Sequence, residues 1–209
     1  MKFNTKLTML AMAAAFTMSA HAATITYTLT QNGCSGSGGC GTGPFGTITL
    51  TDLSSTSVTV TETLAAGERF AGTGAGDALE FNTKAGSTLS GFTAGFAAGP
   101  SPDSASTFGT FVYSVTCTTC QGGNAGNPTG PLTFTVTNAS GLSIADFVAN
   151  LGGYFFAADI VGNGNTGNVA AIGGGTGGGS QTPEPATMAL TMSGLALVAI
   201  SSFRKKSKV

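Results

Sequence analysis

Apolar residues alternate with threonine or another small polar residue in several short segments of the chain. Ile25, Tyr27 and Leu29 are separated by threonines, and the same spacing recurs at Val58 and Val60. Successive side chains of a strand point to opposite faces, so each segment has one face for a core and one for solvent. Such half-buried segments are typical of antiparallel sheets, because parallel strands are buried on both faces and form continuous apolar runs.

The alternation and the Gly, Pro, Asn and Ser turns between segments predict eight or nine strands. We expect them near Thr24–Gln31, Phe45–Asp52, Ser57–Leu64, Ala78–Asn82, Leu89–Phe92, Phe108–Thr116, Pro131–Asn138 and Tyr154–Val161, with a possible last strand at Val169–Ile172. One short helix is expected at Ile144–Leu151, capped by Ser143. The predicted fold class is all-β, an antiparallel β-sandwich or jelly-roll-like domain over residues 23–172.

The first 22 residues have the pattern of a signal peptide. Lys2 and Lys6 precede an apolar run from Leu7 to Met18, and Ala20 and Ala22 form an A-x-A cleavage signal. A short buried helix is the alternative, but the run is too uniformly apolar to have a polar face. We therefore expect export through the Sec translocon and cleavage by signal peptidase.

The C-terminal part divides into a linker, an apolar span and a basic end. Residues 173–182 are Gly-rich and predict a flexible linker. The apolar span from Ala186 to Phe203 is long enough for a single transmembrane helix. Its apolar side chains include Ala186, Leu190, Leu195, Leu197, Val198, Ile200 and Phe203, and the basic stop consists of Arg204, Lys205, Lys206 and Lys208. The basic residues predict that the C-terminus stays in the cytoplasm.

The distribution of charge along the chain argues against nucleic acids as partners. Charged residues make up only 8% of the chain, and most basic ones lie in the two terminal segments. Between residues 23 and 172, two basic residues, Arg69 and Lys84, face eight acidic ones, which leaves a net charge of −6. A region without a basic face cannot neutralise phosphates, so we expect no nucleic-acid binding.

The four cysteines form two local pairs, Cys34 with Cys40 and Cys117 with Cys120. An even number in an exported chain predicts disulfides, and four cysteines allow three connectivities. Local bridges are favoured because they close most easily, although crossed bridges would enclose longer loops. A redox C-x-x-C motif is disfavoured because a loop follows it, and a zinc site because the first spacing is too wide.

Other chemistry can be tested by elimination. The only histidine, His21, is removed with the signal peptide, so a Ser-His-Asp or Cys-His site is impossible in the mature chain. Carboxylate-dependent glycan hydrolysis stays open through four acids on neighbouring segments: Glu62, Glu68, Asp77 and Glu80. Glu62, however, simply continues a strand alternation. We expect no enzyme, no catalytic residue and no cofactor.

The segment Asp159–Asn168 contains carboxylate and amide oxygens that could bind calcium. Calcium takes six to eight oxygens, and this segment offers one carboxylate. A Gly/Asn turn is the better interpretation, because both residues tolerate positive φ. We therefore expect no metal site.

The C-terminal residues carry a family resemblance. Thr182-Pro183-Glu184-Pro185-Ala186-Thr187, followed by the apolar span and basic end, resembles the PEP-CTERM sorting signal of Gram-negative bacteria that make exopolysaccharide. The resemblance implies recognition by an exosortase, a membrane cysteine transpeptidase-like enzyme. It also implies cleavage near Pro183, Glu184 and Pro185, which would be substrate residues, after an intermediate in the inner membrane.

The central region resembles PEP-CTERM cargo domains more loosely, through three segments: Gly46–Asp52, Asp77–Asn82 and Gly153–Ile160 with Thr166–Val169. This resemblance implies a β domain and no specific activity. The sequence thus predicts an exported cell-surface, extracellular-matrix or secreted protein with a structural or adhesive role in exopolysaccharide-associated biofilm. A carbohydrate- or calcium-binding module is the alternative, and a glycan hydrolase ranks third.

Overall fold

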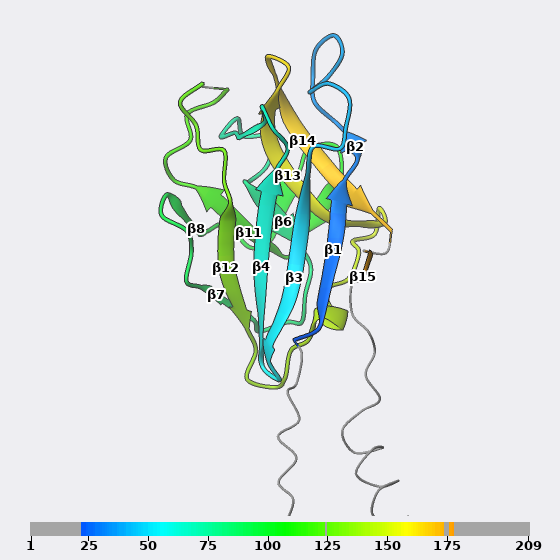
Figure 1. Ribbon diagram of the computed structural model, residues 1–209, viewed down its shortest axis with the longest axis vertical. Coiled ribbons are helices and arrows are strands. Elements are labelled where there is room, and N and C mark those ends of the chain that lie inside the picture. The colour runs from blue at the N-terminus through cyan, green and yellow to red at the C-terminus, as the bar shows by residue number, and fades with distance from the viewer. Residues whose placement is uncertain (1–21, 124, 174–175, 178–209) are drawn as a thin grey trace, which may run out of the picture. The chain divides into compact units, whose positions relative to one another are not determined.

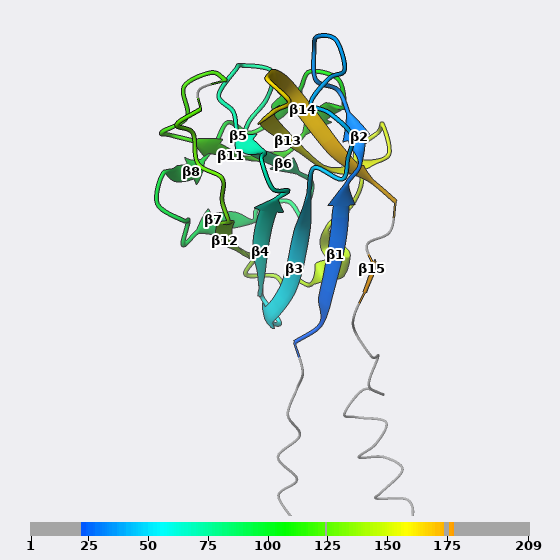
Figure 2. The ribbon, with the colours of Figure 1, turned by 45° about the horizontal axis from the view of Figure 1, so that its top comes forward.

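In a computed structural model of the chain, the structure describes residues 22–123, 125–173 and 176–177. These residues form antiparallel sheets, with a single turn of 3₁₀ helix, η1 (Ile144–Asp146). Two large sheets pack face to face, as Figures 1 and 2 show, and their facing side chains make one core. The prediction of an all-β antiparallel fold is confirmed.

The first sheet has the strand order β15-β1-β3-β4-β12-β7. Its strands are β1 (Thr24–Leu29), β3 (Gly46–Ser54), β4 (Ser57–Leu64), β7 (Thr88–Ser90), β12 (Leu132–Thr137) and β15 (Thr176–Gly177). Threonines of neighbouring strands pair on the outer face, and Thr61 and Thr133 hydroxyls are 3.3 Å apart. The apolar residues that alternate with these threonines are buried between the sheets.

The second sheet has the strand order β2-β14-β13-β6-β11-β8, with β5 beside β13. Its strands are β2 (Gln31–Asn32), β5 (Arg69–Phe70), β6 (Leu79–Phe81), β8 (Phe96–Ala98), β11 (Tyr113–Cys117), β13 (Tyr154–Gly162) and β14 (Asn165–Ile172). The β13–β14 hairpin turns at Asn163 and Gly164, which both have positive φ. A two-residue Asn-Gly loop of this kind matches the twist of antiparallel strands.

A small hairpin of β9 (Asp103–Ala105) and β10 (Gly109–Phe111) forms a separate two-stranded sheet. It lies against the outer face of the second sheet, where Ala105, Phe108 and Phe111 bury a small apolar cluster with Ala157 and Ala170. The second sheet is therefore covered on both faces, by the main core on one and by the β9–β10 hairpin on the other.

The main core is centred on aromatic rings from both sheets. The ring of Phe81 in β6 has its centroid 5.8 Å from that of Phe134 in β12 and 5.7 Å from that of Phe147. Phe156 in β13 completes the group, with its ring centroid 6.3 Å from that of Phe81. Aromatic pairs at these separations add to the stabilisation from burial itself.

The expected helix at Ile144–Leu151 is wrong beyond its first turn. Asp146 accepts hydrogen bonds from the Ser143 backbone N–H (2.8 Å) and hydroxyl (3.0 Å), which closes the turn. Phe147 is already extended and buried in the core, and Val148 pairs with β6 through Asn82. Leu151 is fully exposed. Burial of Phe147 against Phe81 thus overrides the helical spacing.

Two strand predictions also need correction. The expected strand Phe108–Thr116 is divided, because β10 pairs with β9 whereas β11 joins the second sheet. The chain changes sheet at Val112, whose N–H donates to Asn82 Oδ1 (2.8 Å). The strand predicted at Val169–Ile172 begins earlier, at Asn165, because it is β14 of the β13–β14 hairpin.

Candidate functional site

The four carboxylates considered for catalysis do not form one site. Glu62 in β4 points into the main core and has no exposed surface, and neither of its carboxyl oxygens has a hydrogen-bond partner. Glu68 lies apart from the other three, just before β5, where its carboxyl is beside Gly162 at the end of β13. Only Asp77 and Glu80 come together, and the Asp77 N–H donates to Glu80 Oε1 at 3.1 Å.

Asp77 and Glu80 belong to a group that we call the acidic layer, which lies between the second sheet and the β9–β10 hairpin. Leu79 and Phe81 of β6 point into the main core, so Glu80 between them points to the other face. The acidic layer consists of Asp77, Glu80, Asp103, Asp159 and Asn168.

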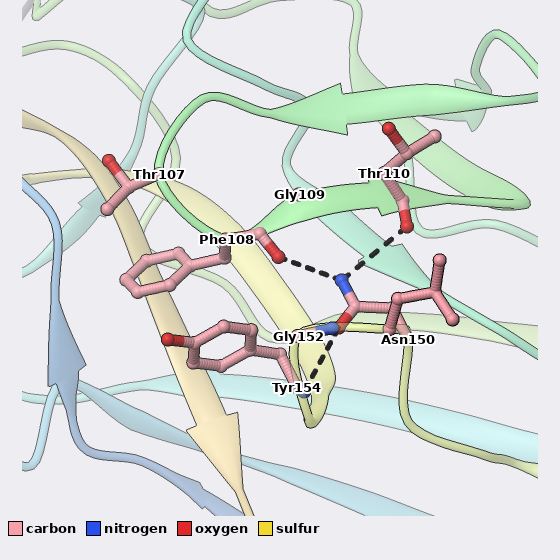
Figure 3. Close-up of a pocket in the computed structure, with 8 residues that line it drawn as sticks. Thr107, Phe108, Gly109, Thr110, Asn150, Gly152 and Tyr154 are labelled. Carbon is pink, nitrogen blue, oxygen red and sulfur yellow. Dashed lines mark hydrogen bonds between the residues drawn. The ribbon is translucent and has the colours of Figure 1, made fainter.

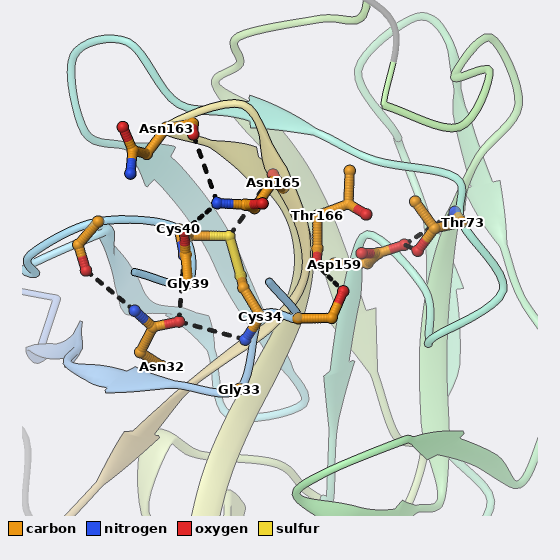
Figure 4. Close-up of a disulfide and its surroundings, with 12 residues drawn as sticks. Asn32, Gly33, Cys34, Gly39, Cys40, Thr73, Asp159, Asn163, Asn165 and Thr166 are labelled. Atoms are coloured by element: carbon orange, nitrogen blue, oxygen red, sulfur yellow. Dashed lines mark hydrogen bonds between the residues drawn. A yellow bond between two sulfur atoms is a disulfide. The ribbon is translucent and has the colours of Figure 1, made fainter. Parts of the chain in front are cut away.

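Hydroxyl and backbone groups orient the carboxylates of the acidic layer. Ser114 in β11 donates to Asp77 Oδ2, and Thr116 donates to Asp77 Oδ1 at 2.9 Å. Thr73 donates to Asp159 Oδ2 through its N–H (3.0 Å) and its hydroxyl (2.7 Å), as Figure 4 shows. These donors come from segments far apart in sequence, so the positions of the carboxylates are set by the packed fold.

The Asp103 carboxyl, on β9, lies close enough to the Asp77 and Glu80 carboxyls to raise the pKa of both. Two carboxyl oxygens can form a hydrogen bond only when one of them carries a proton. Carboxyls this close repel one another when all are ionised, and a proton on one of them removes that repulsion.

Three oxygens of fully buried side chains in the acidic layer have no hydrogen-bond partner: Glu80 Oε2, Asp159 Oδ1 and Asn168 Oδ1. The basic residues of the described part of the chain bind elsewhere. Arg69 donates to the Asn127 carbonyl (3.3 Å), and Lys84 donates to the carbonyls of Ser140 and Gly141. No ion pair thus compensates the acidic layer within the described residues.

Burial raises the pKa of three carboxyls of the acidic layer, those of Asp77, Glu80 and Asp159. It raises the pKa of Glu80 from 4.5 to about 9; the hydrogen bond from the Asp77 N–H opposes this rise, and the charges of Asp103 and Asp77 add to it. Burial likewise raises the pKa values of Asp77 and Asp159, although hydroxyl donors oppose the rise at both. In the main core, burial followed by the charge of Glu80 raises the pKa of Glu62 well above 4.5. Glu80 is therefore protonated at neutral pH.

Within the described ranges, no three His, Cys, Asp or Glu side chains are placed to hold a metal ion. Most of the Asp159–Asn168 segment considered for calcium is strand, and its loop consists of Asn163 and Gly164 alone. The prediction of a Gly/Asn turn is confirmed. Asp159 itself is buried within β13 and lies outside that turn.

A pocket of about 410 Å³ lies between the β9–β10 hairpin and the loop before β13. The rings of Phe108 and Tyr154 meet edge to face at 4.9 Å on one side of it (Figure 3). Asn150 ties the two segments together, because it donates to the Phe108 carbonyl (2.8 Å) and accepts from the Tyr154 N–H (3.1 Å). The pocket is lined by Thr107, Phe108, Gly109, Thr110, Asn150, Leu151, Gly152 and Tyr154, and so by no carboxylate.

The cysteines form the two local bridges, Cys34–Cys40 and Cys117–Cys120. Around the first bridge (Figure 4), Asn32 Oδ1 accepts from the Cys34 N–H (3.2 Å), and Asn165 Nδ2 donates to the Gly39 carbonyl (2.7 Å). The Gly-rich loop is thereby fixed to the start of β14. No cysteine among the described residues is free.

The predicted targeting residues fall mostly outside the described residues. Ala20, the sorting motif Pro183–Pro185, the apolar span Ala186–Phe203 and the basic stop all lie there, whereas Ala22 is described and exposed. No described helix is both long and apolar enough to cross a membrane. The structure therefore leaves the predictions for both ends as predictions.

Sequence reasoning missed Asp103 altogether and considered Asp159 and Asn168 only as the ends of a calcium loop, not as part of a buried acidic group. For Asp159 a signal existed, because it interrupts the otherwise apolar run Tyr154–Val161. A strand buried on both faces, as β13 is, must bury any acid that it contains. Asp103 gave no such signal, since it lies in a Ser- and Pro-rich segment typical of an exposed loop.

Comparisons of this chain with protein families, with curated proteins and with solved structures find no match.

Proposed function

We propose that the protein is an exported component of the cell surface or extracellular matrix, with a structural or adhesive role, which an exosortase sorts and processes. The observation that carries the proposal is the pair of disulfides in a threonine- and glycine-rich sandwich, Cys34–Cys40 and Cys117–Cys120. Disulfides persist in oxidising compartments, which is consistent with the signal-peptide pattern of residues 1–22.

The arrangement of the domain's ends supports a tethered module. β15 pairs with the beginning of β1, at Ile25 and Thr26, so the chain enters and leaves the domain close together (Figure 1). Both disulfide loops lie at the opposite end, beside the β13–β14 turn: Asn165 binds the first loop, and Gly123, just after the second bridge, approaches Thr166. Two residues of the predicted linker at 173–182, Thr176 and Gly177, thus form β15 instead of flexible chain, and the rest of the linker would hold the loop end away from the membrane.

The mass of the mature protein tests the proposal. We expect a form that begins at Ala23 and ends near Pro185 in the surface or medium fraction, and a longer form that reaches Val209 in membranes. Glu184→Ala should leave only the longer form, whereas Ser180→Ala in the linker should be processed normally. Equal processing of Glu184→Ala and the unchanged chain, or a mass that always reaches Val209, would contradict exosortase processing.

The pocket between Phe108 and Tyr154 favours a second candidate function, the binding of a saccharide from the surrounding polysaccharide. An aromatic face beside hydroxyl groups suits a sugar ring, and Tyr154 is only half-buried. Calorimetric titration with the organism's own exopolysaccharide tests it. Binding should weaken at least tenfold in Tyr154→Ala, which is about 1.4 kcal/mol, and not in Leu53→Ala, a substitution of an exposed residue on β3.

A further inference from the structure

The β9–β10 hairpin is joined to the rest of the described domain by few backbone hydrogen bonds. It forms its own two-stranded sheet and shares no strand ladder with the second sheet beneath it. Single hydrogen bonds connect it to its surroundings, such as the Ser106 N–H to the Ala75 carbonyl (2.7 Å) and Asn150 to the Phe108 carbonyl. Elements with few backbone bonds to their neighbours open at lower free energy than the whole domain.

Two features hold the underside of this hairpin to the sheet. One is the apolar cluster of Ala105, Phe108 and Phe111 against Ala157 and Ala170. The other is the acidic layer, where Asp103 of β9 meets Asp77 and Glu80. The contact of these carboxyls is attractive while they share protons and repulsive once the protons are lost.

Every titratable group that faces Glu80 is an acid. The loop before β6 contributes Asp77 and β9 contributes Asp103, and Asp159 of β13 in turn lies near Asp77. The neighbouring strands β11 and β14 contribute only neutral groups, Ser114, Thr116 and Asn168, and Glu62 of β4 acts from the main core. No basic side chain of the described domain is available to replace a lost proton.

We propose that shared protons in the acidic layer hold the β9–β10 hairpin against the second sheet, so that loss of these protons releases the hairpin and uncovers the apolar cluster beneath it. The unpartnered Glu80 Oε2 and the buried Asn168 Oδ1 fit this arrangement, because a carboxyl O–H is the donor that such oxygens lack. Release would also open the pocket, since Thr107–Thr110 line it.

Opening should depend on pH in a defined direction. The closed hairpin keeps a proton on Glu80 that the open form releases, so the equilibrium constant for opening should rise about tenfold per pH unit for each such proton. The rise should begin at pH 4.5, where a solvated carboxyl loses its proton. It should end at about pH 9, where Glu80 in the closed form also loses its proton.

Hydrogen–deuterium exchange on the full chain tests the proposal. After correction for the intrinsic pH dependence of exchange, residues 103–111 should lose protection about tenfold per pH unit relative to β3 and β4. Glu80→Gln should abolish this pH dependence, because glutamine neither gains nor loses a proton. Asp103→Asn, at a partly exposed position, should weaken it even if the glutamine variant does not fold.

Glu68→Gln is the matched control, because Glu68 is an acid outside the acidic layer, and it should keep the pH dependence of the unchanged chain. The same loss of protection in β3, β4 and residues 103–111 would show global unfolding and overturn the proposal. So would protection of residues 103–111 by millimolar Ca²⁺ that depends on Glu80, because the acidic layer would then hold a cation instead of protons.

Discussion

Replacing Glu62 with methionine should stabilise the domain. Glu62 is fully buried among apolar residues of the main core, beside Ile48 and Leu132 of the neighbouring strands. A buried polar group without a hydrogen bond costs about 1–3 kcal/mol, and both oxygens of Glu62 lack a partner. Methionine is unbranched and of similar length, so it can fill the same space.

The gain should grow with pH. Burial raises the pKa of Glu62 well above 4.5, so the folded protein holds a proton that the unfolded chain releases. Below pH 4.5 both states carry this proton and the difference vanishes. Above it, the free energy of unfolding of the unchanged protein should fall by about 1.4 kcal/mol per pH unit relative to Glu62→Met, until the folded form also ionises.

Urea unfolding of the full chain at several pH values measures both effects. Glu62→Gln is the matched control, because it removes the titration and keeps a buried polar group. The free energy of unfolding of Glu62→Gln should therefore lie below that of Glu62→Met by an amount that does not change with pH. This amount should be most of the pH-independent difference between the unchanged protein and Glu62→Met. The reasoning would be refuted if Glu62→Met were less stable than the unchanged protein, or if its advantage did not change with pH.

Four further substitutions test other parts of the structure by the same unfolding measurement. Cys34→Ser and Cys117→Ser should cost about 2.4 and 1.9 kcal/mol, from the entropy of closing loops of about seven and four residues; equal stability with and without reductant would contradict this. Gly164→Ala should cost about 1–2 kcal/mol, because alanine disfavours the positive φ there and no neighbouring atom lies within 4 Å to add a clash. Phe111→Ala should cost about 3–5 kcal/mol through the cavity it leaves, and a loss below 1 kcal/mol would show that the hairpin contributes little to stability.

The strands of the first sheet could be predicted from sequence because one face of each meets water. Thr59, Thr61 and Thr63 alternate with buried residues along β4, and this period of two is visible in the letters alone. β13 was also predicted, although it is buried on both faces, because its apolar run is long. Short strands such as β5 and β8 were missed, since two or three residues cannot show a period.

The acidic layer could be predicted only in part. Asp77 and Glu80 are close in sequence, but Asp103 and Asp159 reach them only through the pairing of β6 with β13 and the folding back of the β9–β10 hairpin. The alternation of β4 predicts that the position of Glu62 is buried. Burying a carboxyl there costs free energy, so the alternation predicts where the residue lies but not how unfavourable its burial is. Spacing identifies which face a residue occupies, but the groups that meet it come from segments far away in the chain.

The neighbouring entry and exit of the chain determine how the domain would transmit force. A pull on the Cys34–Cys40 loop, resisted by the chain after β14, would load the pairing of β2 with β14, because β2 leads directly into that loop. The disulfides Cys34–Cys40 and Cys117–Cys120 prevent the two loops that they close from extending under tension. By contrast, a pull between the two ends of the domain would first separate the two-residue contact of β15 with β1 and leave the core unstrained. The fold should therefore yield first where the chain enters and leaves, before its core is disturbed.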